Sequence, residues 1–108
     1  MFKSSFPGKW GVEDLIVFSL YLSGKDKKQG LDFEDLTNEC FKNFPQVFCL
    51  KKYPVWPDTR KLDRPLRDLR RKGLIKNDIK WRFFLTAKGE KIAREASKLL
   101  SQKKLFNF

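Results

Sequence analysis

One segment, FPQVFCLKKYPVWPD at residues 44–58, constrains the fold of this chain more than any other feature, because it carries three prolines among aromatic residues. Proline lacks a backbone N–H and clashes with the preceding helical turn, so these residues cannot form one continuous helix. We expect an ordered, aromatic-rich loop over residues 44–57, with a short extended piece at residues 47–50. The helices must therefore lie on either side of this loop.

Apolar residues at helical spacing predict two helices before the loop. The first covers Val12–Ser23, with Glu13 and Asp14 in its first turn, where the helix dipole favours acidic side chains. The second covers Phe33–Asn43 and is capped by Asp32.

A third helix is expected after the loop, where Asp58 can cap a segment that ends at Gly73. Its buried face consists of three leucines, Leu62, Leu66 and Leu69. Pro65 would remove a hydrogen bond from the interior of this helix. The helix therefore either kinks at Pro65 or begins at Asp63, and both alternatives stay open.

A β-hairpin and a last helix complete the expected fold. Two short strands, residues 74–76 and 79–85, are separated by Asn77 and Asp78, which tolerate tight turns. Thr86 caps a helix that ends near Gln102, and its apolar residues are Ile92, Ala93, Ala96, Leu99 and Leu100. We expect an α+β fold in one domain over residues 12–102. An irregular leader at residues 1–11 precedes it, with Phe6 and Trp10 packed on the domain, and a loose tail at residues 103–108 follows.

Several kinds of chemistry are excluded by residue types that the chain lacks. It has no histidine and two cysteines, Cys40 and Cys49, which leaves no serine triad and too few ligands for a cysteine zinc site. The segment GKDKKQG at residues 24–30 lacks the spacing of a phosphate-binding loop. We expect no enzymatic activity, no metal and no cofactor, and both cysteines reduced as small core residues.

The longest apolar stretch, residues 15–22, is too short to cross a membrane. No membrane partner is expected, and a cytoplasmic location fits best: with the nucleoid, or in the nucleus if the organism is eukaryotic.

The positive charge lies in the second half of the chain. Residues 1–50 carry six basic and seven acidic side chains, whereas residues 51–108 carry 18 basic and six acidic ones. A lysine-rich solubilising surface would scatter its charges along the chain, but six arginines lie between Arg60 and Arg82. Because arginine suits bidentate contact with phosphate and guanine, this concentration favours a polyanionic partner, with nucleic acid the leading candidate.

Two segments, LRDLRRKGLIKN at residues 66–77 and FFLTAKGEKIA at residues 83–93, resemble the winged helix-turn-helix superfamily. The first is similar to a recognition helix that runs into a wing strand, and the second to the other wing strand and the last helix. The resemblance implies a duplex DNA-binding protein, most simply a small transcription regulator that dimerises through its first and last helices. The long loop at residues 44–57 and Pro65 depart from the family pattern.

The resemblance also places the DNA contacts on a recognition helix at about residues 58–72 and a wing at about residues 74–85. The expected contact residues are Thr59, Arg60, Lys61, Arg64, Arg67, Arg70, Arg71, Lys76, Lys80 and Arg82. Asp63 and Asp68 can pair with neighbouring arginines and reduce what is available to phosphate. The alternative function is an interaction or accessory module that brings a larger complex to nucleic acid with little sequence specificity.

Aromatic residues outside the helices are expected in the core. Trp81 alternates with its strand neighbours and is interpreted as a core residue rather than a stacking platform. A second group of aromatic residues, Phe44, Phe48, Tyr53 and Trp56, is interpreted as a small satellite core under the loop. The alternative, with Lys51 and Lys52 between them, is a surface that stacks on single-stranded nucleic acid.

Overall fold

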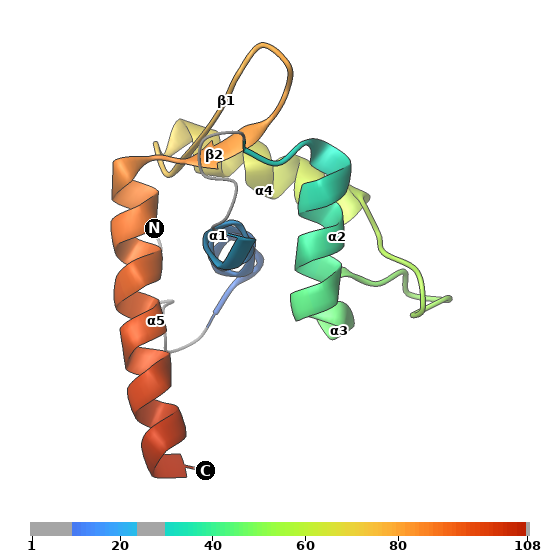
Figure 1. Ribbon diagram of the computed structural model, residues 1–108. Coiled ribbons are helices and arrows are strands. Elements are labelled where there is room, and N and C mark those ends of the chain that lie inside the picture. Colours follow the sequence, from blue (N-terminus) through green and yellow to red (C-terminus); the bar gives the residue numbers. More distant parts are fainter. Residues whose placement is uncertain (1–9, 24–29, 108) are drawn as a thin grey trace.

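Helix α1 (Val12–Ser23) lies at the centre of the molecule, with the other long helices around it (Figure 1). The computed structural model describes residues 10–23 and 30–107, and the side chains of residues 10–23 and 30–98. The run of α1 residues from Asp14 to Leu20 is buried. Its neighbours are α2 (Phe33–Asn43), α4 (Arg60–Arg71), strand β2 (Phe83–Leu85) and α5 (Ala87–Asn107). The central position explains why α1 is buried on more than one face.

The bounds of α1 and α2 are those that the apolar spacing predicts. The Asp32 carboxylate accepts a hydrogen bond of 2.8 Å from the Asp35 backbone N–H and so caps α2. Leu36 and Cys40 are fully buried in the core. Trp10 packs on this core as expected, with its ring centroid 5.1 Å from that of Phe18. Phe6 and the segments at residues 1–9 and 24–29 lie outside the described residues.

The proline-rich segment contains an additional short helix, α3 (Pro45–Phe48), so the part of the chain that the structure describes has five helices rather than the expected four. The extended piece predicted at residues 47–50 is wrong in its first half, because proline at the first position favours a helical turn here. Cys49 and Pro57 then form an isolated antiparallel bridge, and the Leu50 N–H donates to the Trp56 carbonyl over 2.8 Å. Residues 49–57 therefore form a closed arm that leads into α4.

Helix α4 begins at Arg60 and continues past Pro65 to Arg71. The Asp58 side chain accepts a hydrogen bond of 3.1 Å from the Arg60 backbone N–H, which supports the expected start near Asp58 and excludes a start at Asp63. Leu62, Leu66 and Leu69 are buried, which confirms the predicted buried face.

The hairpin pairs β1 (Ile75–Asn77) with β2 in antiparallel register, with Asn77 opposite Phe83. The predicted two-residue turn at Asn77 and Asp78 is wrong, because residues 78–82 form a longer loop and the second strand begins at Phe83 rather than Ile79. The physical reason is the Asp78 carboxylate, which accepts backbone N–H groups of Lys80 at 3.0 Å and Arg82 at 2.9 Å. These bonds keep residues 80–82 out of the strand ladder.

Helix α5 starts at the predicted cap, where the Thr86 hydroxyl accepts the Gly89 N–H at 3.1 Å. Ala93 and Ala96 are buried as expected, while the side chains of Leu99 and Leu100 lie outside the described ones. The helix extends to Asn107, so the expected end near Gln102 was wrong. The described residues thus form an α+β fold of five helices and a two-stranded antiparallel hairpin. None of the described helices is long and apolar enough to cross a membrane.

Candidate nucleic-acid interface

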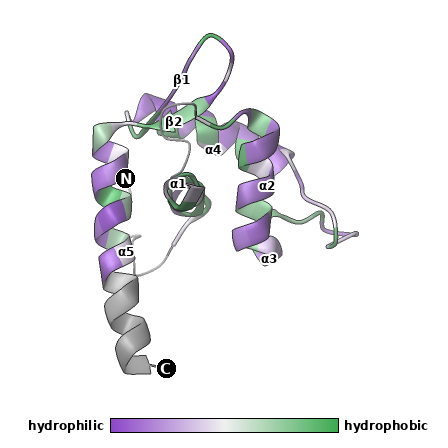
Figure 2. Cartoon of the chain, in the orientation of Figure 1, coloured by the Kyte–Doolittle hydropathy of each residue, from purple (hydrophilic) through white to green (hydrophobic). Residues whose placement is uncertain are grey.

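Helix α4 has one apolar face toward the core and one basic face toward solvent. The exposed residues expected to contact nucleic acid here are Thr59, Arg60, Lys61, Arg64, Arg67 and Arg71. Arg70 is half-buried beside the hairpin. Figure 2 shows hydrophilic and hydrophobic residues alternating along α4, as this division requires. The helix therefore presents several guanidinium groups on one surface.

Acidic neighbours engage part of this basic face. Arg67 pairs with Asp63 at 4.0 Å and Arg71 with Asp68 at 3.1 Å, as the helical spacing predicts. Arg60 pairs with Asp58 at 3.4 Å through a side chain that is 86% exposed. The Arg67–Asp63 pair is exposed on both sides and contributes little to stability, so a phosphate group can replace that carboxylate at small cost. The Asp58 carboxylate is buried and also accepts the Arg60 backbone N–H. Lys61 instead donates to the Val47 carbonyl over 3.0 Å and ties α4 to α3.

Three of the expected contact residues, Arg64, Lys76 and Lys80, are exposed and their side chains make no hydrogen bond or ion pair with any residue that the structure describes. Arg64 lies on α4, whereas Lys76 and Lys80 lie on the hairpin. These residues carry charge that no described carboxylate neutralises.

The hairpin loop is organised by Asp78. Besides the two backbone N–H groups, its carboxylate binds the Arg82 guanidinium, with Nη2 at 3.0 Å and Nε at 3.1 Å. The hydrogen bond from the Arg82 backbone N–H lowers the pKa of Asp78, as do the side chain of Arg82 and the Lys80 N–H. Arg82 therefore holds the loop together as well as adding charge to it.

Arg70 connects α4 to the hairpin. Its Nη1 donates to the Asn77 side-chain oxygen over 2.8 Å, and its guanidinium carbon lies 5.9 Å from the centroid of the Trp81 ring. The expectation that Trp81 is a core residue is wrong, because this residue is 60% exposed. Trp81 lies in the loop rather than in a strand, so the alternation used for that prediction does not apply. Ile79, at 94% exposure, is also in this loop, and Figure 2 shows a hydrophobic segment at its far end.

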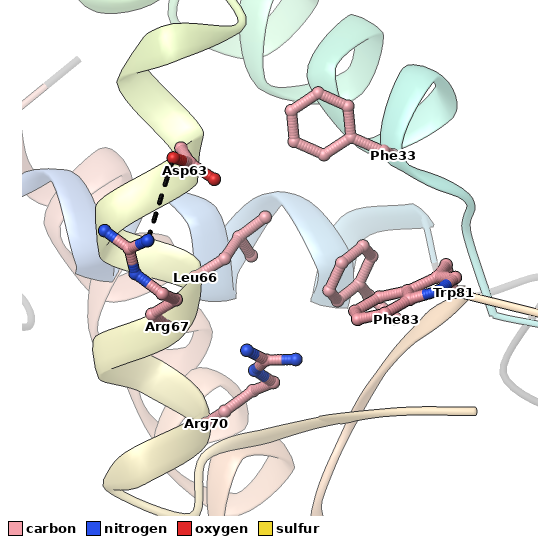
Figure 3. Close-up of a pocket in the computed structure, with 7 residues that line it drawn as sticks. All are labelled: Phe33, Asp63, Leu66, Arg67, Arg70, Trp81 and Phe83. Carbon is pink, nitrogen blue, oxygen red and sulfur yellow. Dashed lines mark ion pairs between the residues drawn. The ribbon is translucent and has the colours of Figure 1, made fainter. Parts of the chain in front are cut away.

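A pocket of about 230 Å³ lies between α2, α4 and the hairpin (Figure 3). We call it the hairpin pocket; its lining residues are Phe33, Asp63, Leu66, Arg67, Arg70, Trp81 and Phe83. Phe33 and Asp63 were not expected at a site. No local sequence signal reveals them, because the pocket forms only when three separate elements meet.

The arm at residues 49–57 is only partly the satellite core that was expected. Phe48 is fully buried and Phe44 packs against the core. Tyr53, Val55 and Trp56 are exposed by 60%, 74% and 61%, so the arm presents its apolar side chains to solvent.

The two cysteines differ in environment, and both are free. Burial raises the pKa of the Cys40 thiol to about 12, with a smaller opposing effect from its hydrogen bond to Ser19. Cys40 is therefore a protonated core residue, as expected, whereas Cys49 is half-buried. The described residues contain no group of three or more histidine, cysteine or acidic side chains that could hold a metal ion.

Comparisons of the chain with protein-family models, curated proteins and solved structures give no match.

Proposed function

We propose that this protein binds duplex DNA through the outer face of α4 and the hairpin, as a small regulator of the winged helix-turn-helix kind. The observation that carries the proposal is the side-by-side placement of two basic elements joined by Arg70. The exposed guanidinium groups of α4 and the exposed lysines of the hairpin, Lys76 and Lys80, lie on either side of that junction. A helix suits the major groove, and a basic loop beside it suits the adjacent phosphates.

The expected contact residues fall into three groups, according to the partners that their side chains have in the structure. Arg64, Lys76 and Lys80 can bind phosphate without breaking a described contact. Arg60, Arg67 and Arg71 must first exchange a carboxylate for a phosphate or a base edge; that carboxylate is exposed for Arg67, half-buried for Arg71 and buried for Arg60. Arg70, Arg82 and Lys61 hold neighbouring elements in place as well.

The expected dimer is constrained by the position of α1. Most of α1 is buried within the domain, and its exposed large apolar residues are Val12 and Leu22, near its two ends. A dimer of this protein would therefore rely mainly on α5.

The exposed arm favours a second candidate function, an accessory module of a larger complex. Its apolar residues Tyr53, Val55 and Trp56 suit contact with a protein, and in Figure 1 the arm projects away from the hairpin. Equal affinity for unrelated DNA sequences would favour this module over a regulator with a defined target site.

The proposal is tested by fluorescence anisotropy of a labelled DNA duplex with Arg64→Ala, Lys76→Ala and a control, Lys42→Ala. The Lys42 side chain is 68% exposed at the end of α2 remote from the hairpin. Each of the first two variants should weaken binding, and each should make the slope of log affinity against log salt less negative by about 1. Equal losses in all three variants would mean that only diffuse charge attracts the DNA, and would contradict the proposed interface.

A further inference from the structure

The hairpin pocket has an apolar floor and aromatic sides. Leu66 and Phe83 are buried, at 4% and 5% exposure, and Figure 3 shows them turned toward the middle of the pocket. Phe33 from α2 and Trp81 from the hairpin loop complete its aromatic lining. Its volume of about 230 Å³ is below the roughly 300–1,000 Å³ of sites for drug-sized molecules. The pocket therefore suits a group the size of one ring system.

Trp81 is held in position at this pocket against its conformational preference. Its φ of 60° lies in the left-handed region, which a bulky residue rarely adopts and which is costly unless the surroundings impose it. The N–H groups of its neighbours Lys80 and Arg82 are bound by Asp78, and Arg70 lies against its ring. The loop thus fixes a largely exposed indole beside the pocket, an arrangement that favours stacking with a partner.

The polar residues of the pocket restrict what that partner can be. Arg67 and Arg70 contribute two guanidinium groups, which suit a phosphate-bearing ligand. Asp63 contributes a 73% exposed carboxylate that can accept N–H groups. A nucleobase on its sugar-phosphate strand offers all three features, namely a flat ring, N–H donors and a nearby phosphate.

We propose that the hairpin pocket holds one unpaired nucleobase of the nucleic acid that α4 and the hairpin bind. This inference rests on the proposed function and deepens it, because it makes a duplex with an unpaired nucleotide a better ligand than a continuous duplex. The base stacks on Trp81, and the adjoining phosphates lie against Arg67 and Arg70.

The experiment compares two labelled duplexes of the same sequence, one fully paired and one with a single unpaired purine in the middle of one strand. Affinities are measured by anisotropy for the natural chain, Trp81→Ala and Trp56→Ala. Trp56 is a matched control because its exposure of 61% is close to the 60% of Trp81 and it lies on the arm. Circular dichroism and thermal unfolding establish that each variant is folded.

The natural chain and Trp56→Ala should bind the duplex with the unpaired purine roughly 5- to 150-fold more tightly than the paired one, the range expected for one stacked base. Trp81→Ala should lose most of that preference while keeping its affinity for the paired duplex. Trp81→Phe, which keeps an aromatic ring, should retain part of it.

Three outcomes overturn the inference. Equal affinity of the natural chain for both duplexes would overturn it and leave the proposed duplex binding intact. A preference that Trp81→Ala keeps, or that Trp56→Ala loses equally, would place the unpaired base elsewhere. Binding to neither duplex would overturn the proposed function together with the inference.

Discussion

At the scale of single residues, Thr86 and Gly89 join the end of α4 to the start of α5. The Thr86 hydroxyl donates to the Gly73 carbonyl over 2.7 Å, and the Thr86 N–H donates to the Leu74 carbonyl over 3.1 Å. Gly89 lies so close to Leu74 that a Cβ atom there would fall on the Leu74 carbonyl oxygen. Hydrogen bonds thus account for Thr86, the close approach to Leu74 accounts for Gly89, and a φ of 76° accounts for Gly73, independent of any role in binding.

Replacing Gly89 with alanine should destabilise the protein more than replacing Gly73. Gly89→Ala forces backbone atoms apart and should cost about 3 kcal/mol, the upper part of the range for overpacking. Gly73 has a φ of 76° but open space around it, so Gly73→Ala should cost only about 1 kcal/mol. Urea unfolding of both variants measures the difference, and an equal or reversed order would contradict the close approach at Gly89.

The buried Cys40 thiol should make stability depend on pH. Its pKa is raised from 9.0 to about 12 in the folded chain, so the unfolded chain loses this proton first as pH rises. The contribution of the Cys40 thiol to the free energy of unfolding is fully present below pH 9 and is lost progressively toward pH 12. Between pH 8 and pH 10 the free energy of unfolding should fall by about 1.4 kcal/mol on account of this group.

Urea unfolding at the two pH values tests this dependence with Cys40→Ala and, as a control, Cys49→Ala. The fall in the free energy of unfolding that the Cys40 thiol causes should be absent in Cys40→Ala and should persist in Cys49→Ala. If both variants lose as much stability as the natural chain, Cys40 titrates normally in the folded state.

At the scale of elements, the hairpin shows both what sequence patterns can predict and where they fail. The bounds of α1 and α2 and the buried leucines of α4 follow from apolar spacing and capping, which act within one element. The loop at residues 78–82 depends on the Asp78 carboxylate, which binds backbone N–H groups two and four residues further along the chain. The alternation of residue types that predicts a strand gives no information about these bonds. The continuation of α4 past Pro65 likewise depends on packing of its leucines against the core.

In the candidate site, too, some features follow from local sequence patterns and others do not. The exposed arginines of α4 follow from helical spacing, and so do their pairs with Asp63 and Asp68. The hairpin pocket requires three elements to meet, so no local pattern could predict it. The exposure of Trp81 depends on the loop at residues 78–82, where a strand was expected.

Replacing Asp78 should loosen the hairpin loop. Asp78→Ala removes the acceptor for the Lys80 and Arg82 N–H groups, so both amides should exchange with solvent faster. Asp63→Ala is the control, because among the described residues Asp63 pairs only with the exposed Arg67 side chain, at 4.0 Å. Amide hydrogen exchange followed by NMR should show faster exchange in the first variant alone.

The same amides should report the titration of Asp78 in the natural chain. Because the folded pKa is lowered from 3.8, the loop keeps these bonds above pH 3.8 and loses them only as pH falls through the lowered value. Their NMR shifts should therefore change with a midpoint below 3.8. A midpoint at or above that value would mean that Asp78 does not hold the loop as described.

At the scale of the whole molecule, the excess of positive charge behind the net charge of +11 lies in the second half of the chain. The N-terminal half is close to neutral and supplies much of the core, whereas α4 and the hairpin carry exposed basic groups next to one another. Such a concentration attracts a polyanion at long range and releases counterions on contact. The proposed function therefore depends on how many phosphates the surface engages at once.

Fluorescence anisotropy of one sequence as duplex DNA, single-stranded DNA and duplex RNA, each titrated at several salt concentrations, tests this claim most directly. If six to eight side chains contact phosphate, log affinity for duplex DNA should fall with log salt at a slope of roughly −5 to −7. Duplex DNA should also bind more tightly than the other two nucleic acids. A slope near zero, or equal affinity for all three, would contradict a DNA-binding surface on α4 and the hairpin.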